Sequence, residues 1–229
     1  MAKRPIFKPV FDKNKNCLFE EIEIEFKWYP GFSVSQKKKS VQSLHDEAKK
    51  KGYDPILEVS TKSNEKLGQK LSAFNLEIDA KKYGKISIES AYQGSKVFEN
   101  GKQYIDLYEK DSIIAKKDER LKNSGEIIEF NFFGEKWNIE PKSAFYDWLY
   151  LKALHPHKDF LKKELLKYKA FSDIEFNPKK SYSCQARTCA ILVSLLKLDL
   201  FDTVMSSQEK FKEIIYKKEY VQSEMKFDD

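Results

Sequence analysis

The first sixty residues include segments in which apolar and charged side chains alternate, as in half-buried strands. The pattern is clearest in residues 17–28, where aromatic and aliphatic residues alternate with Glu and Lys until Pro30 and Gly31 interrupt them. Beyond this break, apolar residues recur at helical spacing until Gly52, a residue type that often ends helices. The pattern predicts strands over 5–10 and 17–28, a helix from about Ser35 to Gly52, and a short buried strand over 56–60.

The second half of the chain carries mainly helical periodicity, interrupted by one hairpin pattern. Asp111 and Pro141 suit the first positions of helices, and Gly134 suits the turn of the hairpin. The pattern predicts a connector over 102–108, a helix over 111–122, a hairpin over 126–137, and helices over 141–154, 159–168, 183–198 and 202–218. The helix over 183–198 is apolar enough to lie at the centre of the core.

No long linker rich in Gly, Pro or Ser divides the chain. We therefore expect the α+β fold class and a single compact, helix-rich domain. Residues 1–55 are expected to form an N-terminal β-containing extension, packed as a hairpin and a helix on a core domain of residues 56–229. A chain of 229 residues with 41% hydrophobic content can bury a sizeable core.

Residues 71–99 combine a turn and a helix in an unusual way. A short apolar turn over 71–76 is followed by a polar stretch that ends in Gly84, and Ser87 is then a suitable N-cap for a helix. This segment therefore predicts a helix that begins at a defined point, directly after a turn.

One side of this predicted helix gathers polar groups. Glu89, Tyr92, Gln93 and Lys96 stand at positions i, i+3, i+4 and i+7, so they would project together. Glu89 and Lys96 would lie roughly 10 Å apart along the helix axis, too far for an ion pair but well placed to hold opposite sides of a ligand. The alternative is a solvated polar face, which is common for charged helix positions.

Several motifs follow one another in the order of a known family. They are the turn Ser72-Ala73-Phe74-Asn75, the run from Ser87 to Phe98, Ile114-Ala115-Lys116 with Arg120, then Trp137, an amphipathic helix over 141–154, and Asp173-Ile174-Glu175. These segments resemble the NADAR superfamily signature, in which a Ser-Asn-Phe turn precedes a helix written Glu-His-Tyr-Tyr-Gln-Ala-x-Lys-Phe. Over nearly its whole length the chain also resembles the NADAR subgroup encoded beside DarT-type ADP-ribosyltransferase toxins.

The chain departs from the family pattern in three places. Ala73 stands where the family usually has Asn, and Ser90 stands where it has His. The late Trp-Gly pair of the family is absent after Glu175.

The resemblance implies an ADP-ribosyl glycohydrolase that removes ADP-ribose from guanine bases in DNA and acts as antitoxin to a DarT-type toxin. Cleavage of an N-glycosidic bond passes through an oxocarbenium-like transition state, which a carboxylate stabilises while another group assists the leaving base. Lys96 and Glu89 are the implied catalytic residues. Lys96 would engage the anomeric carbon of the opened ribose as a Schiff base, and Glu89 would bind ribose hydroxyls or transfer a proton. A plain structural role for Glu89 in the first helical turn is the alternative.

Further residues are implied to bind the ligand: Ser72, Phe74, Asn75, Tyr92, Gln93, Lys116, Arg120, Trp137, Asp173 and Glu175. Phe74 and Trp137 could equally be core aromatics. Lys116 and Arg120, one helical turn apart, either clamp the pyrophosphate or belong to an exposed basic face. If residues 173–176 are extended, Asp173 and Glu175 share one face and form a pair suited to general acid–base chemistry.

Charge and cysteine content limit the partners, metal sites and cellular compartment that we expect. A net charge of +6 from 42 basic and 36 acidic residues describes a mixed surface, which permits an anionic partner such as DNA without requiring one. Lysine runs at 37–39 and 49–51 could contact phosphates or simply be solvated. The three cysteines have no metal-ligand or disulfide spacing, so we expect no metal, no cofactor and a reducing compartment. Without a membrane-spanning apolar run or a signal-peptide core, we expect a cytoplasmic protein with no membrane partner.

Two other functions stay open on the sequence. One is an N-glycosidase that acts on a small phosphoribosyl or nucleotide metabolite, which predicts activity on free nucleotides without salt-sensitive DNA binding. The other is a non-enzymatic module that covers the active site of the toxin, an alternative that the departures at Ala73 and Ser90 leave open. The expected partners are ADP-ribosylated DNA, ADP-ribose as the product, and the cognate toxin if the two proteins bind directly.

Overall fold

The computed structural model describes residues 1–12, 15 and 17–216. Its strands are β1 (Ala2–Pro9), β2 (Phe19–Phe26), β3 (Ile56–Glu58), β4 (Glu77–Asp79), β5 (Lys85–Ser87), β6 (Lys96–Phe98), β7 (Ile127–Phe132), β8 (Glu135–Asn138) and β9 (Ala170–Ser172). Its α-helices are α1 (Val34–Lys50), α2 (Lys66–Lys70), α3 (Ile88–Gly94), α4 (Ser112–Lys117), α5 (Ala144–Leu154), α6 (Lys158–Leu165), α7 (Gln185–Lys197), α8 (Phe201–Met205) and α9 (Gln208–Ile215). Short 3₁₀ helices are η1 (Lys81–Tyr83), η2 (Ile105–Glu109), η3 (Glu119–Leu121) and η4 (His155–His157).

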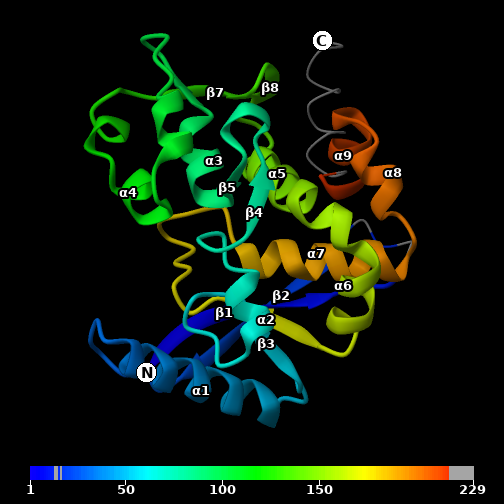
Figure 1. Ribbon diagram of the computed structural model, residues 1–229. Helices are drawn as coiled ribbons and strands as arrows, with labels where there is room; N and C mark the ends of the chain where they lie inside the picture. Colours follow the sequence, from blue (N-terminus) through cyan, green and yellow to red (C-terminus); the bar gives the residue numbers. More distant parts are fainter. Residues whose placement is uncertain (13–14, 16, 217–229) are drawn as a thin grey trace, which may run out of the picture.

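The fold is α+β, as predicted, and its strands form small separate sheets (Figure 1). One sheet has the strand order β2-β1-β9-β3, a second the order β6-β7-β8, and β4 pairs with β5. Helix α7 crosses the middle of the molecule between the first sheet and α5 (Figure 1). The expected helix at the centre of the core is therefore confirmed, since α7 is buried along most of its length.

The first sheet is covered on both faces. Neighbouring residues of β1 point to opposite faces, so Ile6 packs into the cluster formed with α1, and Phe7 packs into the larger cluster formed with α7. On the α1 side, Val41, Leu44 and Ala48 form the buried stripe that the sequence predicted. In β2, where hydrophobicity alternates, Ile24 and Phe26 are buried and the glutamates are exposed, as in the half-buried strand that the sequence predicted.

The N-terminal strands share a sheet with later parts of the chain. β1 pairs antiparallel with both β2 and β9, and β3 runs parallel to β9. The expected boundary between residues 1–55 and 56–229 thus falls between strands of one sheet. As a division into domains, it stays a prediction.

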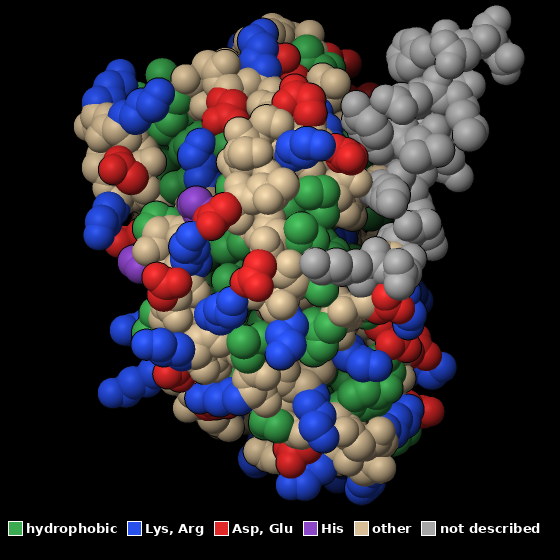
Figure 2. Space-filling view, turned by 90° about the vertical axis from the view of Figure 1, so that its right-hand side faces the viewer, with side chains coloured by type: hydrophobic (Ala, Val, Ile, Leu, Met, Phe, Trp, Pro, Cys, Tyr) green, Lys and Arg blue, Asp and Glu red, His purple; other side chains and the backbone are tan. Residues whose placement is uncertain are grey.

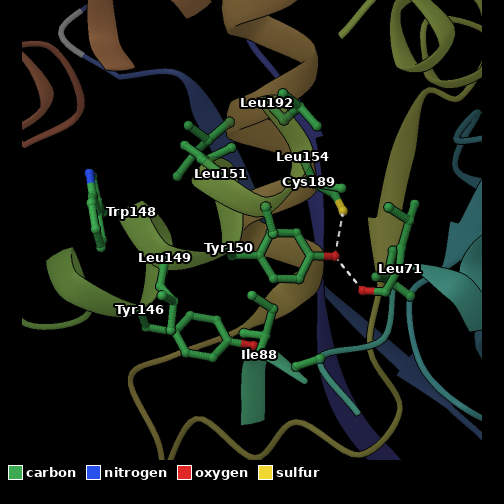
Figure 3. Packing of buried hydrophobic residues seen from close by; sticks show 14 of the residues in the cluster. Leu71, Ile88, Tyr146, Trp148, Leu149, Tyr150, Leu151, Leu154, Cys189 and Leu192 are labelled. Atoms are coloured by element: carbon green, nitrogen blue, oxygen red, sulfur yellow. Dashed lines mark hydrogen bonds between the residues drawn. The ribbon is translucent and has the colours of Figure 1, made fainter. Parts of the chain in front are cut away.

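A tyrosine on α5 connects the core to the turn over 71–76. Tyr150 is fully buried, and its hydroxyl donates a hydrogen bond to the main-chain oxygen of Leu71 (Figure 3). The Tyr150 hydroxyl oxygen also lies 3.4 Å from Sγ of Cys189 on α7. Because a buried hydroxyl without a partner is costly, this contact holds the turn at a defined position on α5 and α7.

Several predicted boundaries are wrong for identifiable reasons. The helix after Ser87 ends at Gly94 instead of continuing towards Glu99, because Val97 and Phe98 enter the sheet as β6 and the carbonyl of Ser95 already accepts from the N–H of Asn131. A side chain at Gly94 would also collide with the Tyr108 ring, 2.6 Å from an added Cβ.

Other differences are smaller. The helix predicted over 111–122 stops at Lys117, because Asp118 caps the short helix η3. The predicted helix start at Pro141 is wrong, since α5 begins at Ala144. The last predicted helix, 202–218, is divided into α8 and α9, and its end at residues 217–218 lies outside the described residues.

Candidate active site

The turn over 71–76 is fastened to the beginning of α3. The Ile88 N–H donates to the Leu76 carbonyl at 2.8 Å, and the Glu89 N–H donates to the Ala73 carbonyl at 3.0 Å. Ser87 caps the helix as predicted, since its hydroxyl accepts from the Ser90 N–H at 3.0 Å. Turn and helix therefore form one rigid wall.

This wall borders a cleft with a volume of about 620 Å³. Most of the predicted site residues line it: Ser72, Phe74, Glu89, Tyr92, Gln93, Lys96, Lys116, Asp173 and Glu175. The rest of the lining consists of Ala73, Tyr146, Phe176, Asn177, Lys180, Ser181, Ser183 and Gln185. The cleft thus gathers chain segments from positions 72 to 185, and its lining is rich in charged and hydroxyl groups.

Glu89 is the most enclosed carboxylate on the α3 wall, with 6% of its surface exposed. Its Oε1 accepts from the Gln93 amide at 2.8 Å, and its Oε2 lies 3.5 Å from the Lys116 amine. The remaining carbonyl oxygen of the Gln93 side chain is buried and has no partner among the described residues. A buried acceptor that lacks a donor inside a cleft is a natural contact for a ligand hydroxyl or N–H group.

Lys96 reaches the cleft from the beginning of β6, where it pairs with Phe130. The prediction that Lys96 shares a helix face with Glu89 is therefore wrong, although both side chains line the same cleft. Its amine lies 5.1 Å from the centre of the Tyr92 ring. The pKa of Lys96 is lowered to about 8, chiefly by burial; Glu89 opposes this shift and Lys116 adds to it.

Tyr92 provides the aromatic support beneath this amine. Its ring stacks on Phe130 and Phe145, with centroid distances of 5.3 and 6.0 Å, and meets Tyr146 edge-on at 5.4 Å. Burial raises the pKa of the Tyr92 hydroxyl to about 12. The ring is therefore held in place by the core while one part of it lines the cleft.

Asp173 and Glu175 form the opposite wall, just after β9. The condition that residues 173–176 are extended is not met. The segment is a turn, because the Phe176 N–H donates to the Asp173 carbonyl at 3.2 Å and the Glu175 N–H donates to Asp173 Oδ1 at 3.0 Å. Both carboxyl groups still line the cleft.

A second buried carboxyl group lies behind Asp173. Glu58 accepts hydrogen bonds from the hydroxyl of Ser60 at 2.6 Å, the hydroxyl of Ser172 at 2.5 Å, and the N–H of Ile174 at 2.9 Å. Burial, with the charge of Glu58 as the next cause, raises the pKa of Asp173 to about 8. The Asp173 carboxyl group is therefore mostly protonated at neutral pH and can donate a proton into the cleft.

Gln185, the first residue of α7, joins the two walls. Its side-chain oxygen accepts from the Ala73 N–H at 2.7 Å, and its amide also forms a hydrogen bond with Asp173. The Gln185 side chain therefore links the turn over 71–76 to Asp173.

The model of the DarT1-associated NADAR antitoxin family matches residues 2–225. The chain belongs to this family. Membership of the NADAR antitoxins implies a DarT toxin as the cognate partner. No curated protein matches the chain.

Three of the predicted ligand contacts in this NADAR chain lie outside the cleft. Trp137 is 1% exposed and packs against Trp148 and Phe211, so the prediction that it stacks on a ligand is wrong. Arg120 binds Asp118 and Asp106 at 2.8 and 2.7 Å and is not among the residues that line the cleft. The Asn75 amide donates to the Gln69 carbonyl at 2.8 Å on an exposed surface.

Two parts of the cleft, the loop over 177–183 and Gln185, were not predicted from the sequence. The loop is held from below by Arg187 of α7, whose guanidinium donates to the Tyr182 carbonyl at 3.0 Å and to the buried Asp147 carboxylate at 2.7 Å. No periodicity or motif marks these residues, because they meet the cleft only through the packing of α7 on α5.

The described residues of this NADAR chain contain no cluster of three or more His, Cys, Asp or Glu side chains arranged to hold a metal ion. No helix in that part of the chain has the length and apolarity to cross a bilayer.

Proposed function

We propose that the protein is an ADP-ribosyl glycohydrolase that removes ADP-ribose from guanine in DNA and so reverses the action of its cognate toxin. One observation carries this proposal: Lys96 and Glu89 line the same cleft, and the pKa of the Lys96 amine is lowered to about 8. A lysine with an ordinary pKa is almost fully protonated at neutral pH and is a poor nucleophile.

Lys96 acts as the nucleophile in this proposal. With a pKa of about 8, about a tenth of the amine is neutral at pH 7. The neutral nitrogen forms a bond to the anomeric carbon while the bond from that carbon to guanine breaks. Opening of the ribose ring then yields an imine, and water releases ADP-ribose and regenerates the amine.

Glu89 and Gln93 act on the ribose. The Glu89 carboxylate stabilises the positive charge that develops at the anomeric carbon, where low exposure makes the interaction strong. The unpaired carbonyl oxygen of Gln93 accepts a hydrogen bond from a ribose hydroxyl. Lys116 and Lys180, which also line the cleft, supply positive charge for the pyrophosphate.

Asp173 serves as the acid for the leaving base. Its pKa of about 8 keeps the carboxyl group protonated at neutral pH, and its position opposite α3 allows it to donate to a nitrogen of guanine. Proton donation lets guanine leave as a neutral base. A base attached to DNA must leave the stack to enter a cleft of this kind.

The two departures from the family pattern, at Ser90 and Ala73, do not remove any of the cleft residues to which this proposal gives a role. The Ser90 hydroxyl donates to the Lys110 carbonyl at 2.8 Å and is not among the lining residues. Ala73 contributes its main-chain N–H, which Gln185 holds. These contacts favour a functional cleft over a module that acts by binding the toxin alone.

The test uses single-stranded DNA that carries ADP-ribosylated guanine, incubated with the wild type, with Lys96→Ala and with Lys96→Arg. Sodium borohydride reduces any imine, and intact-mass analysis detects the protein adduct. We expect release of ADP-ribose and an adduct with the wild type only. Lys163→Ala, which removes an exposed lysine of α6, is the matched control and should behave as the wild type.

Three results would contradict parts of this proposal. Intact modified DNA with the wild type would exclude the proposed substrate, and cleavage of free nucleotides instead would favour the metabolite N-glycosidase. Release of ADP-ribose by Lys96→Ala at the wild-type rate would exclude the nucleophile. A stable complex with the toxin that survives Lys96→Ala, without any hydrolysis, would favour the non-enzymatic module.

A further inference from the structure

A cationic segment follows directly after the acidic strand β2. Residues 20–25 contain four glutamates, whereas residues 27–45 contain four lysines and no Asp or Glu. Two of the glutamates, Glu20 and Glu23, pair with lysines of β1 at 3.2 and 2.7 Å. Among the residues that the structure describes, Lys38 and Lys39 have no ion-pair partner. The positive charge of this segment is therefore largely uncompensated.

Three aromatic residues, Trp28, Tyr29 and Phe32, form the corner between β2 and α1, which we name the aromatic corner. The corner is held to α1, because the Tyr29 N–H donates to the Ser40 hydroxyl at 3.0 Å and the Tyr29 carbonyl accepts from the same hydroxyl at 3.3 Å. Cations of Arg4 and Lys37 lie 5.5 and 5.3 Å from the centre of the Trp28 ring.

Phe32 differs from the other aromatic residues in being fully exposed, at 102% of its reference area. A phenylalanine at the tip of a fixed corner, with both faces in water and lysines within the next two helical turns, offers a flat apolar surface beside positive charge. This combination matches single-stranded nucleic acid, in which bases expose flat faces next to phosphates.

The aromatic corner also lies next to the cleft. Lys37 of α1 approaches the Glu175 carboxylate at 3.9 Å, and Glu175 lines the cleft. In Figure 1, the loop that precedes α1 and the chain that follows β9 lie on the same side of the molecule. A strand that placed one base in the cleft would therefore pass close to this corner.

We propose that the aromatic corner binds the single-stranded DNA next to the modified guanine, with a base stacked on Phe32 and phosphates against Lys38 and Lys39. This inference rests on the proposed function, since it extends the path of the same substrate. Double-stranded DNA fits less well, because stacking in a duplex leaves no base face free for the Phe32 ring.

The first test measures binding without hydrolysis. The fluorescence anisotropy of a labelled, unmodified twelve-nucleotide oligothymidine is followed against the wild type, Phe32→Ala and the double variant Lys38→Ala/Lys39→Ala. We expect Phe32→Ala to weaken affinity by about tenfold. The double variant should reduce the slope of log affinity against log salt by about 0.7 per lysine. Phe32 and Lys39 are exposed and Lys38 is half-buried, so the variants should fold, which circular dichroism checks.

Controls come from α6. Phe160→Ala removes another exposed phenylalanine, and Lys163→Ala removes another exposed lysine. Both should bind the oligonucleotide as the wild type does. Equal losses in these controls would show non-specific adsorption and would overturn the proposal.

The second test separates this surface from the chemistry of the cleft. Each variant is assayed on ADP-ribosyl guanosine and on an ADP-ribosylated oligonucleotide, and the ratio of the two kcat/KM values is compared with that of the wild type. We expect the ratio to shift against the oligonucleotide by about tenfold in Phe32→Ala. Failure of the wild type on both substrates would contradict the proposed function, whereas an unchanged ratio with normal turnover would contradict only the aromatic corner. Weaker association of Phe32→Ala with the toxin, with unchanged DNA affinity, would also overturn this proposal.

Discussion

The cleft and the face formed by α6 and α8 both bring acidic and basic side chains together, but in different surroundings. On the α6/α8 face, Asp202 pairs with Lys158 at 2.6 Å, and basic and acidic side chains are interspersed over the surface (Figure 2). In the cleft, Glu89 is 3.5 Å from Lys116, a longer distance, yet its side chain is only 8% exposed. Water reaches both members of the first pair. In the second pair it still reaches Lys116, whose side chain is 52% exposed, but is largely excluded from Glu89, so the burial of the carboxylate rather than the distance sets it apart.

The difference in burial between the two regions also explains which side chains have pKa values shifted in the direction that catalysis needs. Lys96 and Asp173, on opposite walls of the cleft, both have pKa values of about 8 because burial disfavours their charged forms. Asp202, in contrast, has its pKa lowered by hydrogen bonds from Lys158 and His155 and keeps its charge. The following changes test this difference, in order of expected effect.

Removal of the buried Asp147 carboxylate should have the largest effect on stability. Asp147 is fully buried and accepts from Arg187 at 2.7 Å and from the Thr188 hydroxyl at 2.5 Å. Asp147→Ala leaves the Arg187 guanidinium without its counter-ion, so we expect a loss of about 3–5 kcal/mol in the free energy of unfolding. Urea denaturation monitored by circular dichroism measures it. A loss below about 1 kcal/mol would mean that the pair is screened like a surface pair.

Glu89→Gln should affect turnover more than folding. The amide keeps the shape and the hydrogen bond with Gln93 but loses the negative charge. We expect kcat on the modified DNA to fall about 10²–10³-fold, as for the loss of one stabilising charge in a water-poor site. Rapid-quench kinetics provide the measurement, and Glu164→Gln on the exposed surface of α6 is the matched control. Wild-type kcat in Glu89→Gln would assign this carboxylate a structural role.

The pH profile tests both cleft groups together. Lys96 must lose a proton to attack and Asp173 must keep one to donate, and both have pKa values of about 8. Activity should therefore rise about tenfold per pH unit below 8 and fall above it, giving a bell-shaped profile. Asp173→Asn should lower the rate and remove the falling limb, while the rising limb of Lys96 remains. A falling limb that survives in this variant would assign it to another group.

Asp202→Ala on the α6/α8 face should have the smallest effect. The carboxylate bonds Lys158 and His155 at short distances, but its side chain is 64% exposed. We expect a melting temperature within experimental error of the wild type and unchanged turnover, measured by differential scanning fluorimetry and the DNA assay. A clear drop in the melting temperature would show that this pair belongs to a wider ion-pair network.

Local rules predicted much of the framework. The alternation in residues 17–28 corresponds to β2, Gly134 lies in the turn between β7 and β8, and Ser87 caps α3. Each of these features depends on a few neighbouring residues and on main-chain geometry, which the order of amino acids displays directly.

The sequence predicted only part of the candidate site. Glu89 and Lys96 line one cleft as the family resemblance implied, but the helix face that was to join them ends at Gly94. Trp137, in contrast, does not line the cleft. An aromatic residue at the end of a hairpin gives the same sequence pattern whether it contacts a ligand or packs in the core. Only its packing against Trp148 and Phe211 decides for the core.

The order of amino acids thus determined the fold class, the cap of α3 and the residue types that the chemistry needs. The tertiary structure alone decided that Asp173 lies beside Glu58 and that Gln185 bridges Asp173 to the turn over 71–76. The reason is physical. Capping and alternation act within a few residues, whereas the burial that shifts the pKa values of Lys96 and Asp173 arises when distant segments exclude water together.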